Sequence, residues 1–300
     1  MTPTEKTIRI AVVQAESSPA DPQENVRILR TFAQQAAHAG CSAVCFPECF
    51  LTGYDPDHAG EKAIPSDSPV LRAVSETAKD LQIDILTGYM ECSDASLQPA
   101  EPAKRSFFIT HAVFYTDGRI LPYHKTHLGA KEQKIFAPGD ALMVFPLSCG
   151  LTAGFQVCVE CHFPEITQTL SLQGAHVVFV PAASPGSAAD RERIWKTVIP
   201  ARAYDNRVYL ACCNLIRKSD PSDKPSLPGG CIVCGPEGDV LAEDFGEMSG
   251  VTVFEVDPAL LARFRSGDDS MRYRYYPDKR RPELYTAQQP VAFLFPRDRV

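Results

Sequence analysis

The 300-residue chain lacks any apolar run that approaches the ~20 residues a membrane-spanning helix needs, so we expect no membrane contact. Its first residues also lack the basic-then-apolar pattern of a secretion signal, which favours a cytoplasmic protein. Positive charge is in the minority, because 30 Lys and Arg face 37 Asp and Glu and leave a net charge of −7. A nucleic acid is therefore not expected as a partner.

Cysteine, by contrast, is abundant, with 11 residues. An odd number without a secretion signal indicates reduced thiols and not a disulfide framework. The pairs Cys158/Cys161 and Cys231/Cys234 have the spacing of metal ligands, but they lie far further apart than the ~15–20 residues typical of zinc ribbons. A structural zinc site is therefore not favoured. A cysteine-rich metal-binding or interaction protein without turnover is kept as the alternative from another functional class.

The order of predicted elements is typical of a mixed α/β protein. Turn signals and apolar spacing predict strands at 8–14, 42–46, 83–89, 154–159, 176–180 and 208–214, helices at 22–40, 69–81, 164–173 and 191–206, and hairpins at 107–123 and 231–243. No linker divides these elements, so we predict one domain over residues 1–300. Residues 271–300, which begin with a basic and aromatic stretch, are expected to form a C-terminal arm that packs on its own or a neighbouring subunit.

Cys158 stands at the break between a predicted strand and the helix that starts at Pro164. A cysteine at such a junction is held on a rigid element and can face a cleft. The backbone N–H groups that follow it favour a thiolate and later an oxyanion. These properties make Cys158 a candidate nucleophile.

A nucleophilic cysteine needs a base and a group that stabilises the oxyanion. Glu48 and Lys125 both follow predicted strands, and α/β sheets place their sites at the carboxyl ends of strands. A carboxylate among apolar neighbours has a raised pKa and can act as a base near neutral pH. The histidines weighed for this role, His127, His162 and His176, lack the local setting of papain-like or caspase-like enzymes.

At these segments the sequence resembles the nitrilase superfamily of carbon–nitrogen hydrolases, in its amidase or carbamoylase-like branch. Residues 46–54 resemble the family's "FPE…TGY" stretch, 123–128 its "RK-x-HL" stretch, and 158–165 its "C-Y-D-x-R-F-P-E" stretch. Glu132 lies where the family has a second glutamate. The resemblance covers nearly the whole chain.

The resemblance implies a four-layer αββα sandwich, subunits paired into a homodimer or larger assembly, and no metal or other cofactor. It implies a hydrolase that cleaves a non-peptide C–N bond of a small linear amide or N-carbamoyl compound through a thioester, releasing ammonia or an amine. Glu48 would be the base, Cys158 the nucleophile, and Lys125 with the Val159 N–H the oxyanion donors. Glu132 would orient Lys125 or the substrate.

The sequence departs from the family pattern beside the nucleophile. His162 stands where Arg is common, Glu160 replaces an Asp, and Val159 replaces an aromatic residue. Together with Tyr54, which either lines the pocket or packs, Val159 and His162 are the candidate substrate-binding residues. The Cys-Trp-Glu of nitrile hydrolases is absent, which argues against nitrile hydrolysis as the native reaction. Nitrile hydrolysis and thioester-based acyl transfer are kept as the alternatives within the family.

Overall fold

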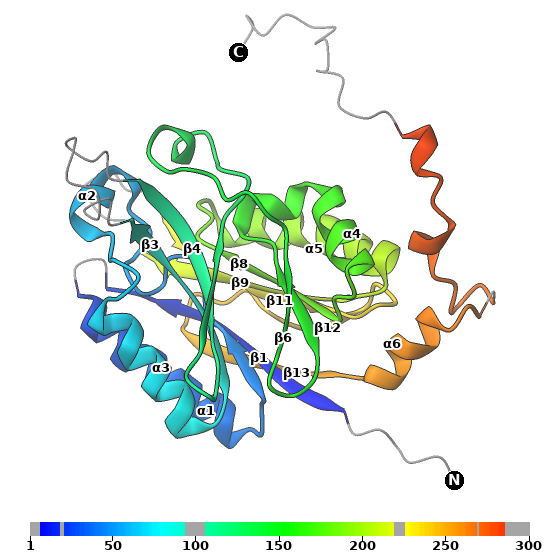
Figure 1. Ribbon diagram of the computed structural model, residues 1–300, viewed down its shortest axis with the longest axis horizontal. Helices are drawn as coiled ribbons and strands as arrows, with labels where there is room; N and C mark the ends of the chain where they lie inside the picture. The colour runs from blue at the N-terminus through cyan, green and yellow to red at the C-terminus, as the bar shows by residue number, and fades with distance from the viewer. Residues whose placement is uncertain (1–6, 19–20, 94–105, 219–225, 269, 286–300) are drawn as a thin grey trace, which may run out of the picture.

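Two β-sheets pack face to face, and helices cover the outer face of each (Figure 1). The computed structural model describes residues 7–18, 21–93, 106–218, 226–268 and 270–285. The first sheet contains β1 (Ile8–Glu16), β2 (Ala43–Cys45), β3 (Asp84–Cys92), β4 (Phe107–Phe114), β5 (Ile120–His124) and β13 (Gly250–Val256). The second contains β6 (Val144–Pro146), β7 (Thr152–Phe155), β8 (Val177–Ala182), β9 (Tyr209–Arg217), β11 (Cys231–Cys234) and β12 (Val240–Asp244). The ends of β1 and β9 pair in parallel and join the sheets, and the short β10 (Leu227–Pro228) extends β9.

Three apolar layers separate the four layers of secondary structure. The inner layer lies between the sheets and includes Val12, Phe155 and Phe179. The helices α1 (Pro22–His38) and α3 (Pro69–Leu81) pack on the first sheet, and α4 (Pro164–Leu172) and α5 (Ala188–Asn206) pack on the second. The predicted αββα sandwich is therefore confirmed.

Capping residues set where the helices begin. The Asp21 carboxylate accepts hydrogen bonds from the first free N–H groups of α1, and the Ser68 hydroxyl does the same for α3. Both predicted starts are confirmed. The helix predicted from residue 191 begins earlier, at Ala188, because the Ser187 hydroxyl caps it by accepting from the Asp190 N–H at 3.1 Å.

The strand predicted at 154–159 is wrong at its end. β7 stops at Phe155, and Cys158 begins a 3₁₀ turn, η4 (Cys158–His162). The turn forms because the Val157 N–H donates to the Glu160 carboxylate at 2.6 Å while the Glu160 N–H donates back to the Val157 carbonyl at 3.1 Å. Cys158 adopts a positive φ of 54° at the head of this turn.

The described part of the C-terminal segment packs against the second helical layer. After α6 (Pro258–Arg265) come the short turns η5 (Tyr276–Lys279) and η6 (Pro282–Leu284), at the orange-to-red end of the ribbon (Figure 1). Tyr275 shares a 3.0 Å hydrogen bond with Ser171 of α4, and Arg207 donates to the Arg274 carbonyl at 3.2 Å. The predicted arm 271–300 lies outside the described residues beyond residue 285. Among the described helices, none is long and apolar enough to cross a membrane.

Candidate active site

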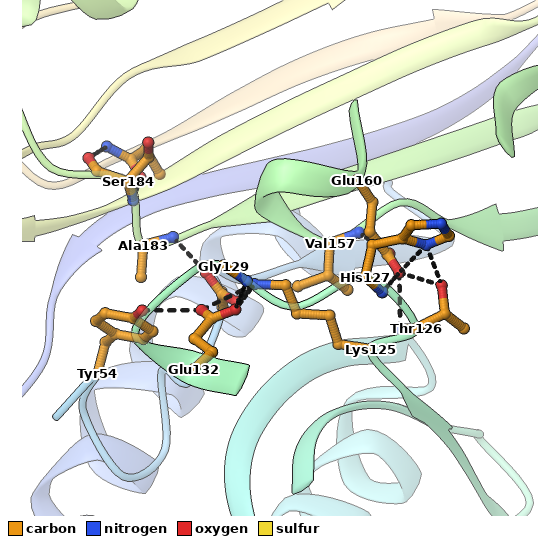
Figure 2. A network of polar contacts seen from close by, with 12 residues as sticks. Tyr54, Lys125, Thr126, His127, Gly129, Glu132, Val157, Glu160, Ala183 and Ser184 are labelled. Atoms are coloured by element: carbon orange, nitrogen blue, oxygen red, sulfur yellow. Dashed lines mark hydrogen bonds and ion pairs between the residues drawn. The ribbon is translucent and has the colours of Figure 1, made fainter. Parts of the chain in front are cut away.

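Lys125 is buried between Glu48 and Glu132. Figure 2 shows the Lys125 ammonium pointing toward the Glu132 carboxylate. Its ammonium lies 2.8 Å from one oxygen of Glu48 and 2.9 Å from both oxygens of Glu132. All three residues are at most 3% exposed. Charges buried this deeply persist only when opposite charges and hydrogen bonds compensate them, so the three groups form one electrostatic unit.

Backbone and hydroxyl donors hold the two carboxylates in place. Glu48 follows β2, and its second oxygen accepts from the N–H of Ala183 at 2.8 Å, directly after β8. Glu132 begins the turn η3 (Glu132–Lys134) and accepts from the Tyr54 hydroxyl at 2.8 Å and from the Gly129 N–H at 2.7 Å. Each carboxylate is therefore oriented by strand ends and loops as well as by Lys125.

Cys158 lies beside this unit on a strained backbone. A left-handed conformation costs a non-glycine residue roughly 1–2 kcal/mol, and here it turns the chain sharply after β7. The side chain is half-buried. Burial raises the pKa of the Cys158 thiol, Glu48 raises it further, and Lys125 opposes both. The thiol therefore keeps its proton at neutral pH until a base removes it.

The charges of the cluster favour a protonated lysine and a basic glutamate. Burial raises the pKa of Glu48, and the nearby Glu132 also raises it, whereas Lys125 lowers it. For Lys125, burial would lower the pKa, but the negative charges of Glu48, Cys158 and Glu132 raise it well above its usual range. Lys125 is thus a fixed cation, and the raised pKa makes Glu48 a stronger base than an ordinary carboxylate.

Glu160 is the residue of this region that sequence reasoning missed. Its fully buried carboxylate accepts from the backbone N–H groups of Val157, Thr126 and His127 and from two hydroxyls, those of Tyr123 and Thr126. Burial would raise its pKa, but the hydrogen bonds from His127, Thr126 and Val157 lower it. Glu160 thereby joins the loop after Lys125 to the turn that carries Cys158 (Figure 2). Its place two residues after Cys158 is the signal that could have found it, although from the sequence alone it is only a departure from the family pattern.

His162 lies at the far end of the same turn and is exposed. Burial of part of the ring and the positive charges of Arg191 and Arg202 lower its pKa, so the ring is neutral at pH 7. The structure therefore places His162 near these arginines and not in the Glu48–Lys125–Glu132 cluster, and its role in substrate binding stays a prediction.

A cavity of about 370 Å³ is lined by residues that follow Lys125, Glu132 and His162 in the sequence, and none of Glu48, Lys125, Glu132 and Cys158 is among its lining residues. Thr126, His127, Phe136 and Phe163 are among its lining residues, and the rings of His127 and Phe163 lie 4.5 Å apart. No disulfide is formed among the cysteines that the structure describes. Within the described residues no group of three or more His, Cys, Asp or Glu side chains is arranged to hold a metal ion.

The sequence is similar to one protein family and to curated amidases. The sequence model of the carbon-nitrogen hydrolase family matches residues 9–266. The chain is 28% identical to the omega-amidase NIT2 of Homo sapiens over 94% of its own length and 98% of that protein. It is 26% identical to the omega-amidase NIT3 of Saccharomyces cerevisiae over 86% of its length and 90% of that protein.

Solved structures agree with these sequence matches. A mutant of the amidase from Nesterenkonia sp. AN1 in complex with acrylamide superposes with a TM-score of 0.75 at 26% identity, covering 95% of this chain and 98% of the other. A second mutant, with the acetamide moiety of fluoroacetamide covalently added at its active site cysteine, superposes with a TM-score of 0.74 at 26% identity over 92% and 95% of the two chains. Both are structures of one amidase of the nitrilase superfamily, and the αββα sandwich of that amidase matches the layers described above.

Proposed function

Because the chain belongs to the carbon–nitrogen hydrolase family, we propose that it hydrolyses the C–N bond of a small linear amide or N-carbamoyl compound through a thioester on Cys158. The observation that carries the proposal is the buried unit of Glu48, Lys125 and Glu132 beside a half-buried thiol on a strained turn. Cysteine-dependent amide hydrolysis is also the chemistry of the superposed amidases.

In the first step Glu48 takes the thiol proton while the Cys158 sulfur attacks the carbonyl carbon. The C=O π electrons move to oxygen, and the Lys125 ammonium and the Val159 N–H donate hydrogen bonds to that oxyanion. Val159 is suited to this role because the N–H groups of the first turn of a helix have no acceptor within it. Preorganised donors at low dielectric stabilise the developing charge without reorganising during the reaction.

In the second step Glu48 returns its proton to the substrate nitrogen as the C–N bond breaks, and ammonia or an amine leaves. The thioester is then attacked by a water that gives one proton to Glu48. Collapse of the second oxyanion breaks the C–S bond, the acid is released, and the thiolate recovers its proton from Glu48. Glu132 acts as a positioning residue, because it holds the Lys125 ammonium while Tyr54 and Gly129 hold Glu132.

The experiment is an ammonia-release assay over a panel of small amides and N-carbamoyl compounds, with the Cys158→Ala variant beside the wild type. We expect turnover by the wild type and a loss of at least about 10⁴-fold for the variant, since the covalent route is gone. Cys149→Ala removes another half-buried thiol outside the cluster and is expected to keep wild-type rates. Equal rates for the wild type and Cys158→Ala would refute the proposal.

The same assay separates the alternatives. Ammonia from nitriles without turnover of amides would indicate nitrile hydrolysis, and a product that forms only with an added amine would indicate acyl transfer. Stoichiometric zinc without turnover would favour the metal-binding alternative. The homodimer and the cytoplasmic location stay predictions, which light scattering of the purified protein and fractionation of cells test.

A further inference from the structure

A second thiol, which the proposed reaction does not use, lies in the same turn as Cys158. The turn η4 begins with Cys158 and contains Cys161 three residues later. Cys161 is 2% exposed and belongs to the apolar layer beneath α4 and α5, and the half-buried Cys158 packs against that same layer. Both are free thiols. One member of the pair is thus open to small molecules, and the other is enclosed by the core.

The geometry of the turn brings the two residues within reach of a disulfide bond. A 3₁₀ helix has three residues per turn and a rise of about 2.0 Å per residue, so positions i and i+3 share a face with Cα atoms about 6 Å apart. A disulfide bond spans Cα atoms roughly 4.4–6.8 Å apart. Cys158 and Cys161 occupy such positions in η4. The positive φ of Cys158 redirects the chain that precedes the turn and leaves this spacing unchanged.

A buried side chain holds the backbone of the turn in this geometry. The Gln156 amide nitrogen donates to the Glu160 carbonyl at 3.0 Å and to the Phe163 carbonyl at 3.3 Å. The Gln156 amide oxygen accepts from the Thr167 hydroxyl of α4 at 2.9 Å. The turn is therefore fixed to the strand before it and to the helix after it, and the two cysteines stay at a constant separation.

The other C-x-x-C pair of the chain shows what the turn contributes. Cys231 and Cys234 have the same spacing, but they lie on β11, where side chains alternate between the two faces and three residues span about 10 Å. Cys231 accordingly packs in the layer between the sheets, and Cys234 packs in the layer beneath the helices. The same spacing in sequence thus gives one pair that can form a bond and one pair that cannot.

The groups around Cys158 and Cys161 support thiol chemistry between them. Burial raises the pKa of the Cys161 thiol to about 11, and the positive charges of Arg191 and Arg202 oppose this rise. Those cations stabilise the thiolate that Cys161 must form to attack another sulfur. For Cys158, the base is already present, because Glu48 serves it in the proposed reaction.

We propose that Cys158 and Cys161 form a site of reversible oxidative modification, at which a peroxide converts the two thiols into a disulfide bond. With hydrogen peroxide, Glu48 takes the thiol proton, the Cys158 sulfur attacks one oxygen, and the O–O bond breaks. The other oxygen takes the proton from Glu48 and leaves as water, so that Cys158 becomes a sulfenic acid. The Cys161 sulfur then attacks the Cys158 sulfur, the S–O bond breaks, and the hydroxyl leaves as water with the Cys161 proton. The two sulfurs together lose two electrons, and the peroxide gains them.

The disulfide has two consequences for the protein. It stops the proposed hydrolysis, because the Cys158 sulfur can no longer attack a carbonyl carbon. It also protects Cys158, since a sulfenic acid without a neighbouring thiol is oxidised further to a sulfinic acid, which thiols do not reduce. The inference goes beyond the proposed function, and the bond itself is detected without any substrate.

The first test identifies the bond in the intact protein. The purified wild type is treated with hydrogen peroxide, its remaining thiols are alkylated, and it is cut by a protease that cleaves after glutamate. Glu160 lies between the two cysteines, so this cleavage leaves them on separate peptides that only a disulfide holds together. We expect mass spectrometry to find Cys158 joined to Cys161 after peroxide and separate after dithiothreitol.

The second test measures amide hydrolysis before and after oxidation. Peroxide should lower wild-type turnover by at least about tenfold, and dithiothreitol should restore it. Cys161→Ala should hydrolyse amides like the wild type before treatment, yet recover at least about tenfold less activity afterwards, because its Cys158 is oxidised to a sulfinic acid. Cys234→Ala removes an equally buried cysteine of the pair on β11 and should recover like the wild type.

The two readouts keep this inference separate from the proposed function. Oxidised wild-type protein without the Cys158–Cys161 linkage, or with Cys158 joined to a different cysteine, would overturn the inference whatever the variants do. Equal recovery of the wild type and Cys161→Ala would overturn it as well. A wild type that forms the linkage but hydrolyses no amide would count against the proposed function and leave the modification site standing.

Discussion

The Glu160 carboxylate gives the sharpest test of how the site is held together. Its two oxygens accept from five donors on two different segments: the Val157 N–H before the nucleophile, and groups of residues 123–127 around Lys125. The Glu160→Gln variant keeps the size and shape of the side chain. It replaces one acceptor oxygen by an NH₂ group and removes the charge.

The expected cost follows from these contacts. In the favoured orientation of the amide, the new NH₂ group faces the Val157 N–H, which then loses its 2.6 Å hydrogen bond and stays buried, at about 1–3 kcal/mol. The remaining hydrogen bonds lose their charge assistance, which adds a comparable amount. We expect the free energy of unfolding to fall by about 3–5 kcal/mol.

Activity should fall as well, because Glu160 joins the two segments that carry Cys158 and Lys125. A displacement of about 1 Å between reacting groups costs roughly 100-fold in rate, and we expect a loss of that order in kcat. Urea unfolding and amide hydrolysis measure the two effects. Glu165→Gln makes the same chemical change on an exposed side chain and should stay within about 0.5 kcal/mol of the wild type.

The stability effect should also depend on pH with a definite sign. Hydrogen bonds hold the pKa of Glu160 below its ordinary 4.5, so its contribution is complete above that pH and is lost as the pH falls through the lower folded value. The stability difference between wild type and Glu160→Gln should therefore shrink below about pH 4.5. A Glu160→Gln protein with wild-type stability and kcat would refute the reasoning that this carboxylate holds the two segments.

Three further predictions concern the buried cluster. Lys125→Met leaves two buried carboxylates without a cation, so it should lower the free energy of unfolding by about 3–5 kcal/mol and abolish turnover. Lys131→Met, on an exposed side chain, should do neither. Urea unfolding measures the stability of both variants, and the ammonia assay measures their turnover. Because burial raises the pKa of Glu48 and the base must be deprotonated, the acid limb of the kcat/KM profile should have its midpoint above pH 4.5, and a midpoint at or below 4.5 would argue against Glu48 as the base. Tyr54→Phe removes the 2.8 Å hydrogen bond to Glu132 and should cost about 1.5–3 kcal/mol of stability and reduce kcat; an unchanged melting temperature would contradict this.

Local chemistry made most of the fold predictable. Asp21 and Ser68 cap α1 and α3 where expected, and the buried strands β2 and β8 read as short apolar runs. What was missed depends on partners distant in the sequence. β13 pairs antiparallel with β1, more than 200 residues away, and only its last four residues alternate between exposed and buried. Its strand conformation is imposed by β1, which the local sequence does not contain.

The residues in and around the candidate site differ in the same way, because some could be predicted from the local sequence and others could not. Glu48, Lys125 and Cys158 could be proposed from sequence because each follows a strand, and strand ends converge at one edge of a sheet. The burial of Arg191 could not be predicted, because Arg191 and Arg193 are the same residue type two positions apart on one helix. Arg191 points inward over Trp195 and forms no ion pair within the described residues, whereas Arg193 is exposed beside Asp190. Which charge is compensated depends on what surrounds each side chain in three dimensions, so the local sequence does not reveal it.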